Sequence, residues 1–221
     1  RIESIGGMGA NLAGKILGEA GVLNMGFNGS NFSSYGSEKK GSPVKAFIRF
    51  CASDVEVRVN SPVIKPHLLA IFHEVLAKTV PVTQGVGPDS IVVLNTSETP
   101  DGAREFLKLH GGTLYCIDAL KIAMEEKTRI NTAILGAICK ASKFLDPDAI
   151  KDMIAKNLGK KYASLIEPNL RTFERGCNEA VSKYFKPDGK YPYIPFSREG
   201  QKIGYFYDHR IHEEKRREEK R

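Results

Sequence analysis

Three short, continuous apolar runs restrict the fold of this chain more than any other feature of its sequence. They occupy residues 68–72, 90–94 and 113–117, and segments with helical spacing or turn residues separate them. Runs of this length without alternating polar residues are typical of parallel strands that are buried on both faces. Because parallel neighbours need crossover connections, the centre of the chain is predicted to be an α/β sheet.

The region before these runs adds further predicted strands and a helix. Residues 1–5 form a strand that enters a glycine turn, and residues 11–20 follow with helical spacing. Residues 26–37 are rich in Gly and Asn, which indicates a short strand and an irregular loop. Residues 44–50 and 55–59 alternate at period two around a short turn, so an antiparallel hairpin is predicted between them.

After Asp118 the pattern becomes helical, and Asp118 itself is expected to cap the first of these helices. Proline at positions 147 and 168 suits the first turn of a helix. The predicted helices cover residues 119–127, 131–142, 147–158 and 168–185. The expected fold class is therefore α/β, with a mixed, largely parallel central sheet that includes an antiparallel hairpin and is covered by helices.

The chain has 221 residues, which is the size of one α/β domain with an appendage. Residues 1–186 are predicted to form that domain. Residues 187–221 begin with a turn and a stretch of Tyr, Pro and Phe that is too short to hold a core of its own. We expect this segment to be an extended arm or linker that docks on partner subunits, and its mixed-charge end at 209–221 to be a solvated helix or tail.

Charge and hydropathy limit the partners of the chain. Lys and Arg number 33 against 26 Asp and Glu, and this net charge of +7 favours acidic partners such as phosphorylated cofactors or an acidic subunit. Nucleic acid is not expected, because alternating signs weaken the field of the basic tail. No apolar run approaches the roughly 20 residues of a membrane helix, and no secretion signal is recognisable, so a cytoplasmic location is expected.

Four cysteines are widely separated in the sequence, and none stands in a C-x-x-C pair or beside a histidine at ligand spacing. Structural zinc and iron–sulfur sites require such groupings. We therefore expect that this chain alone holds no metal and that the cysteines are reduced thiols.

The glycine turn at Gly6, Gly7, Met8 and Gly9 invites comparison with dinucleotide-binding loops. Glycines in such loops let the backbone approach a pyrophosphate at a helix N-terminus. The G-x-G-x-x-G pattern started at Gly7 requires glycine at position 12, where this chain has Leu12. No Gly-Lys-Ser/Thr follows the turn either, so the nucleotide signal is weak beside a structural strand-to-helix turn.

Several ordered motifs together resemble the gamma subunit, or domain III, of the 2-oxoacid:ferredoxin oxidoreductases. That family has a strand, Gly-Gly-Gln-Gly and a helix, then an aromatic residue with Gly, an acidic residue, two basic residues and Gly-Ala-Pro or Gly-Gly before a strand that carries Arg. Its later helix begins Asn-x-x-x-Leu-Gly-Ala. The corresponding pieces here are Gly6-Gly7-Met8-Gly9, Tyr35-Gly36, Glu38, Lys39-Lys40, Gly41-Ser42-Pro43, Arg49, and Asn131 to Ala137.

The resemblance covers about residues 1 to 185 and implies a division of labour among subunits. This chain would be a gamma subunit without a catalytic residue or metal, in a complex that oxidises pyruvate or another 2-oxoacid, such as phenylglyoxylate or oxalate. Thiamine diphosphate, iron–sulfur clusters and coenzyme A would belong to the complex, with thiamine-binding and ferredoxin-like subunits as partners. The pocket or interface candidates are Gly7, Met8, Gly9, Asn11, Tyr35, Glu38, Lys39, Lys40 and Ser42.

Two departures from the family pattern concern the chemistry of these candidates. Met8 replaces the usual Gln and removes an amide, and Lys39 and Lys40 replace what is often Arg, exchanging a planar bidentate donor for point charges. Two other functions remain open beside the gamma-subunit hypothesis. One is a non-catalytic binding module of another complex, and the other is a stand-alone nucleotide-dependent dehydrogenase, against which the failed fingerprint argues.

Overall fold

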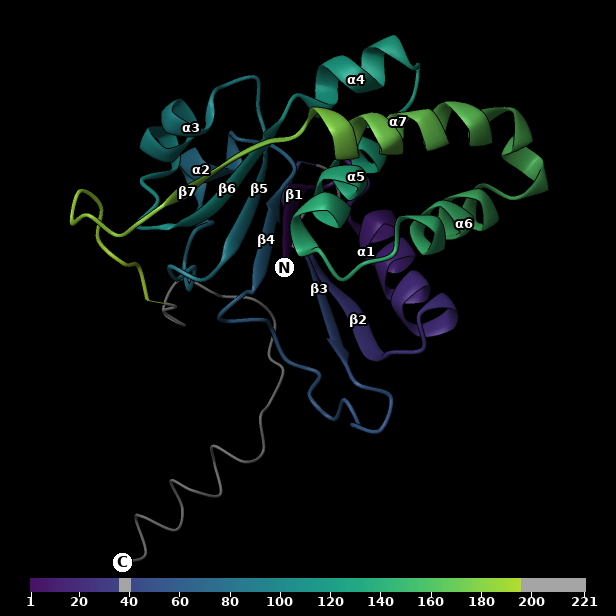
Figure 1. The fold of residues 1–221 in the computed structure, drawn as a ribbon, viewed down its shortest axis with the longest axis horizontal. Helices are drawn as coiled ribbons and strands as arrows, with labels where there is room; N and C mark the ends of the chain where they lie inside the picture. The colour runs from purple at the N-terminus through teal and green to yellow at the C-terminus, as the bar shows by residue number, and fades with distance from the viewer. Residues whose placement is uncertain (36–40, 196–221) are drawn as a thin grey trace, which may run out of the picture.

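A seven-stranded mixed sheet forms the centre of the chain (Figure 1) in a computed structural model that describes residues 1–35 and 41–195. The strand order is β2-β3-β1-β4-β5-β6-β7. Strands β1, β4, β5 and β6 run parallel to one another, whereas β3, β2 and β7 join antiparallel. The strands are β1 Ile2–Ile5, β2 Asn28–Tyr35, β3 Pro43–Cys51, β4 Leu68–Ile71, β5 Ile91–Asn95, β6 Gly112–Ile117 and β7 Val181–Phe185.

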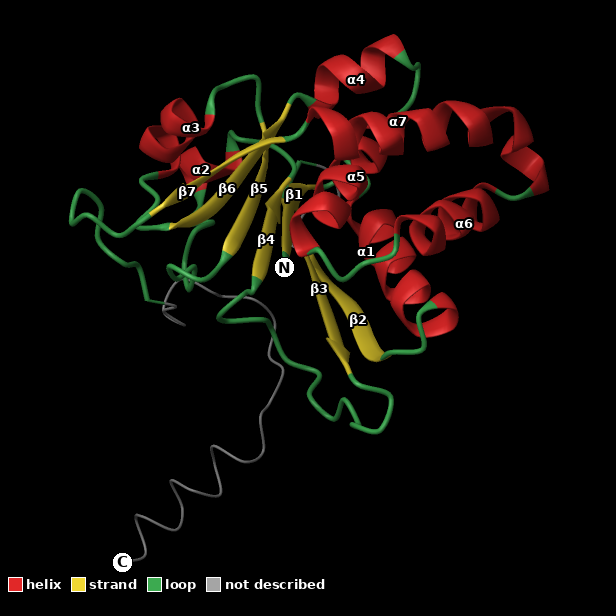
Figure 2. Ribbon diagram, viewed as in Figure 1, coloured by secondary structure: helices red, strands yellow, loops and turns green. Residues whose placement is uncertain are grey.

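Helices cover both faces of the sheet (Figure 2). Each face has its own apolar core. The larger core lies under α1, α5, α6 and α7, and the smaller core lies under α2 and α3. The helices are α1 Ala10–Glu19, α2 Leu76–Thr79, α3 Pro100–Leu107, α4 Ala119–Glu125, α5 Ile130–Ser142, α6 Pro147–Leu158 and α7 Ile166–Glu179, with a π-helical turn at Ala20–Asn24 and a 3₁₀ turn at Lys160–Leu165.

The parallel centre that the sequence predicts is confirmed. The three apolar runs form β4, β5 and β6, and their middle residues are almost fully buried. Asp118 caps α4 as expected, since its carboxylate accepts a hydrogen bond from Lys121 N–H at 2.9 Å. Pro147 occupies the first turn of α6, and Asp146 before it accepts from Asp148 N–H at 2.9 Å.

The predicted hairpin has a different partner strand. Strand β3 pairs antiparallel with β2 and with β1, so the hairpin consists of β2 and β3. Residues 55–59 form no strand, and Val55 and Val59 are about half exposed. Residues 55–59 therefore lie outside the sheet in spite of their alternating pattern, whereas the polar segment Asn28–Tyr35 forms an edge strand.

The last helix also ends earlier than its sequence pattern predicts. Helix α7 stops at Glu179, and Ala180 has extended backbone angles. Residues 181–185 then form β7, which pairs antiparallel with β6 at the edge of the sheet. β-Branched and aromatic residues favour this strand, and its pairing with β6 outweighs the helical spacing.

The segment after β7 was expected to leave the domain, but its described part, residues 186–195, lies against the domain instead. No residue of 196–221, including Phe196, falls within the described chain. The contacts that hold 186–195 are a two-bond ion pair of Arg104 with Asp188 at 2.8 and 2.9 Å, Lys190 with Glu105 at 2.6 Å, His110 Nδ1 with Tyr191 O at 2.8 Å, and Gly85 N–H with Ile194 O at 2.9 Å. Polar groups on the domain surface thus hold residues 186–195, whereas the boundary at residue 186 and docking of the arm on partner subunits stay predictions.

Candidate functional site

The glycine turn joins β1 to α1 at the carboxyl ends of the parallel strands. Gly7 and Gly9 both have positive φ, +98° and +86°, a conformation that glycine adopts without steric cost. Gly9 is the N-cap of α1 and offers no side chain to the first turn of that helix. Between them, Met8 is partly buried and packs against the larger core. Asn11 lies in the first turn of α1.

The second family motif, from Tyr35 to Pro43, contacts the glycine turn at its far end. Gly6 N–H donates to the carbonyl oxygen of Ser42 at 2.9 Å, and Ile5 pairs with Pro43 where β3 begins. Tyr35 ends β2 and pairs with Val44 through its backbone. The candidates Glu38, Lys39 and Lys40 lie outside the described residues. Their neighbours on both sides, however, stand at the same end of the sheet as the glycine turn.

The motif from Asn131 to Ala137, at the start of α5, supplies a residue that is not among the pocket or interface candidates. Asn131, in the first turn of α5, is only 4% exposed. Its Cγ atom lies 3.0 Å from the position that a Cβ atom would take at Gly9. Glycine at position 9 therefore lets α5 approach the turn closely. A polar residue at the start of an otherwise apolar helix is the sequence signal that could have identified Asn131.

A network of polar side chains continues this end of the sheet past β4 and β5. The Asn95 side chain donates to Phe72 O and accepts from Ala119 N–H, each at 3.0 Å. Thr96 Oγ1 donates to the Glu74 carboxylate at 2.9 Å. Sequence patterns alone did not identify this network, because each residue reads as an ordinary strand end.

The position of the turn within the topology suits a binding site. The helix after β1 covers one face of the sheet, whereas the helices after β4 and β5 cover the other face. The chain direction around the sheet thus changes between β1 and β4. In open α/β sheets, ligands bind outside the carboxyl ends of the strands at such a switch point.

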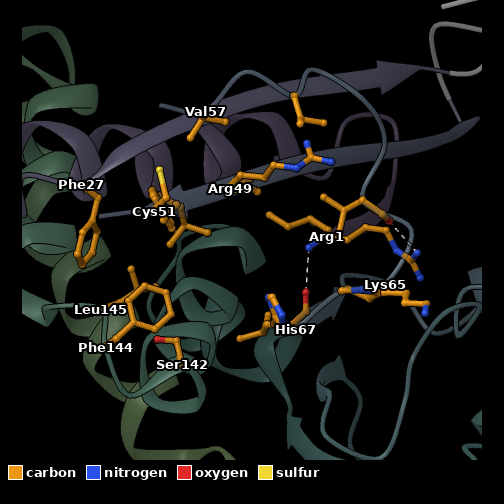
Figure 3. A pocket seen from close by; sticks show the side chains of 18 of the residues that line it. Arg1, Phe27, Arg49, Cys51, Val57, Lys65, His67, Ser142, Phe144 and Leu145 are labelled. Atoms are coloured by element: carbon orange, nitrogen blue, oxygen red, sulfur yellow. Dashed lines mark hydrogen bonds between the residues drawn. The ribbon is translucent and has the colours of Figure 1, made fainter. Parts of the chain in front are cut away.

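A cavity of about 860 Å³ lies at the opposite, amino ends of the parallel strands (Figure 3). Strand β1 pairs with β3 only as far as Ile2 and Ala46. The second half of β3, beyond Ala46, therefore borders this cavity on the side toward β4. Its walls are mainly apolar, and its charged side chains are mostly cationic. These are Arg1, Arg49, Arg58 and Lys65, with His67 and one acidic residue, Glu56, beside them.

Arg49 is the arginine that the resemblance placed on β3, and its side chain lines this cavity. Its Nη1 atom is buried and has no hydrogen-bond partner in the described part of the chain. Burial also lowers the pKa of the Arg49 guanidinium. The cavity therefore suits a carbonyl or carboxylate group within an apolar surrounding.

Metal ligation finds no support among the side chains of residues 1–35 and 41–195, where no three His, Cys, Asp or Glu residues come together. Burial raises the pKa of the Cys116 thiol to about 12, and the nearby Glu98 carboxylate adds to this shift. A thiol with this pKa is not a nucleophile at neutral pH. No helix in the described ranges combines the length and hydropathy that a bilayer crossing requires.

Comparison with known proteins assigns this arrangement to a class. The family model described as pyruvate ferredoxin/flavodoxin oxidoreductase matches residues 1–179. The pyruvate/ketoisovalerate oxidoreductases common subunit gamma of Thermococcus litoralis is 36% identical over 169 residues, which cover 74% of this chain and 90% of that protein. Pyruvate synthase subunit PorC of Thermotoga maritima is 32% identical over 176 residues, 78% of this chain and 89% of that protein.

The fold agrees with these sequence relatives. The crystal structure of the pyruvate oxidoreductase subunit PORC from Thermotoga maritima matches with a TM-score of 0.69 and 28% identity, over 82% of this chain and 97% of that one. The doubly wound sheet with its glycine turn thus defines a subunit of the 2-oxoacid oxidoreductase class. The chain belongs to the pyruvate ferredoxin/flavodoxin oxidoreductase family, and within it to the gamma type.

Proposed function

We propose that the end of the sheet with the glycine turn is the surface by which this gamma subunit faces a partner near its thiamine diphosphate or coenzyme A pocket. The observation that carries the proposal is the hydrogen bond from Gly6 N–H to Ser42 O at 2.9 Å. This bond joins two motifs that are more than 30 residues apart in the sequence. Contact between Gly9 and Asn131 brings the third motif to the same place.

The charge of this surface supports an anionic partner. Lys39 and Lys40 stand between Tyr35 and Ser42, whose backbones are held at the glycine turn by strand pairing and by the Gly6 bond. Positive charge near a helix N-terminus favours phosphates or carboxylates, and the proposal is that Lys39 and Lys40 supply this charge. The proposed ligand is therefore a phosphorylated cofactor in the partner subunit or an acidic surface of that subunit.

In the assembled complex, we propose the oxidative decarboxylation of pyruvate or another 2-oxoacid to acyl-CoA and CO₂, with electrons passed to ferredoxin or a similar acceptor. Thiamine diphosphate and iron–sulfur clusters would lie in partner subunits, in the cytoplasm. The residues of this chain would then position and complete the pocket without taking part in bond making. Iron analysis and visible absorbance of the chain expressed alone should show no cluster, and stoichiometric iron would contradict this division of labour.

A charge reversal tests the proposed surface. The double variant Lys39→Glu, Lys40→Glu should raise the KM for coenzyme A or weaken assembly with the partner subunits, because it replaces attraction by repulsion. Assembly is measured by size-exclusion chromatography of the mixed subunits, and KM by 2-oxoacid oxidation in the reconstituted complex.

The matched control is Lys143→Glu, Lys186→Glu, which makes the same change in net charge. Both control residues are exposed, and they follow α5 and β7 at the amino ends of the parallel strands. This variant should assemble and bind coenzyme A as the parent chain does. If the Lys39, Lys40 variant behaves like the control in both measurements, the proposed surface has no role in either step.

A further inference from the structure

Helices α5 and α7 cross at two glycines that bring their backbones into direct contact. A Cβ atom at Gly136 would lie 2.7 Å from Cys177 N and still closer to Phe173 O. A Cβ atom at Gly176 would collide in the same way with the carbonyl group of Ala133. Side chains at this crossing, or one turn away from it, are therefore held close to each other.

Two cysteines occupy those positions. The Cys177 thiol on α7 donates to Gly136 O on α5 at 3.2 Å, so it points across the crossing. The Cys139 thiol on α5 donates to Leu145 O at 3.5 Å, and it can donate instead to the sulfur of Cys177 when Cys177 is a thiolate. Cys139 is only 4% exposed, whereas Cys177 is partly exposed.

The two thiols differ in chemical character because of this contact. Hydrogen bonding with Cys139 lowers the pKa of Cys177, while the same contact and burial raise the pKa of Cys139. Cys177, the more accessible thiol, is thus also the one that ionises more readily, and Cys139 lies beside it. Such a pair, a partly exposed attacking thiol beside a buried resolving thiol, resembles the arrangement that redox-active cysteines use.

We infer that Cys139 and Cys177 are a redox pair that a hydroperoxide converts into a disulfide between α5 and α7. The Cys177 thiolate attacks the terminal oxygen of hydrogen peroxide, and the O–O bond breaks to leave a sulfenic acid and hydroxide, which takes up the thiol proton as water. The Cys139 thiol then attacks the sulfenic sulfur, the S–S bond forms, and a second water leaves. Two electrons pass from the two sulfurs to the peroxide.

The bond would act on the glycine turn through α5. Asn131 in the first turn of α5 packs against Gly9, so tying α5 to α7 also limits the movement of Asn131 at the turn. The inference does not depend on the proposed partner surface, since it concerns thiols within this chain. Cys51 and Cys116 serve as internal controls, because the Cys51 thiol donates to backbone carbonyls of Asn28 and Val55 and Cys116 is buried on β6.

The test uses the full chain, reduced and then treated without air with one equivalent of hydrogen peroxide. Peptide mapping without reductant should recover one crosslinked peptide pair that contains Cys139 and Cys177, and a dithiol should reverse it. The oxidised chain should melt higher by on the order of 5–10 °C, as expected when a disulfide closes a loop of this length. The Cys116→Ser variant should behave in the same way as the parent chain.

Variants separate the roles of the two sulfurs. In Cys139→Ala a sulfenic acid should accumulate on Cys177 and be trapped by dimedone, whereas in Cys177→Ala no dimedone adduct should form on Cys139. An unchanged thiol count in the parent chain would overturn the inference. So would a crosslink that uses Cys51 or Cys116, or one that joins two chains.

Discussion

Replacement of Gly136 by Ala tests how much of the fold's stability depends on the α5–α7 crossing. The added methyl group would meet Phe173 O and Cys177 N, which are backbone atoms that cannot rotate away. Overpacking of this kind costs about 1–3 kcal/mol, and two backbone contacts favour the upper end of that range. Alanine inside a helix recovers about 1 kcal/mol over glycine, so the net loss should be about 2 kcal/mol.

This loss should be measured by thermal and urea unfolding of the reduced chain. For a domain of this size, about 2 kcal/mol corresponds to a fall in Tm of about 4–8 °C. The control is Gly102→Ala in α3, where the nearest atom to the new methyl group is Glu98 Oε2 at 3.1 Å, the end of a flexible side chain. This variant should be as stable as the parent or slightly more stable. Equal stabilities for Gly136→Ala and Gly102→Ala would refute the reasoning.

Two further predictions concern the glycine turn and the segment after β7. Gly9→Ala should lower the free energy of unfolding more than Gly7→Ala does. Alanine at either position must adopt a left-handed backbone, which costs about 1–2 kcal/mol, but only a Cβ atom at position 9 also contacts Asn131. Equal losses in unfolding experiments would remove any role for that contact. Arg104 lowers the pKa of Asp188 to about 2, so the ion pair stabilises the docked segment above pH ~4 and is lost as pH falls toward 2. In Asp188→Asn, amide exchange of residues 186–191 should be faster at neutral pH and should lose this pH dependence, and exchange equal to the parent's would contradict it.

The parallel strands were predictable from sequence because a short run without polar residues fits a strand that is buried on both faces. Residues 91–94 of β5, for example, have no polar side chain that could face water. The hairpin partner was not predictable in the same way. Residues 55–59 alternate more regularly than β2 does, but alternation specifies a strand only where a neighbouring strand is available, and that depends on the whole topology.

For the candidate site too, local patterns were predictable from the sequence and contacts between distant segments were not. The glycine turn and the segment that ends at Ser42 were identified as local patterns, since glycine requirements and family motifs are read within a few residues. The close approach of Asn131 to Gly9 is a contact between distant helices and leaves only a weak local signal. The docking of residues 186–195 likewise depends on Arg104, which reads in sequence as a solvated helix residue.

The segment that carries the family motifs spans two separate sites. Ser42 lies at the glycine turn, and Arg49 lines the cavity at the amino ends of the parallel strands. Between them β3 is extended, and seven steps of about 3.3 Å separate the two residues by about 23 Å. One small ligand therefore cannot contact both. Arg49 and Ser42 therefore lie toward opposite ends of β3, so a substitution of Arg49 should leave the hydrogen bond between Ser42 and the glycine turn unchanged.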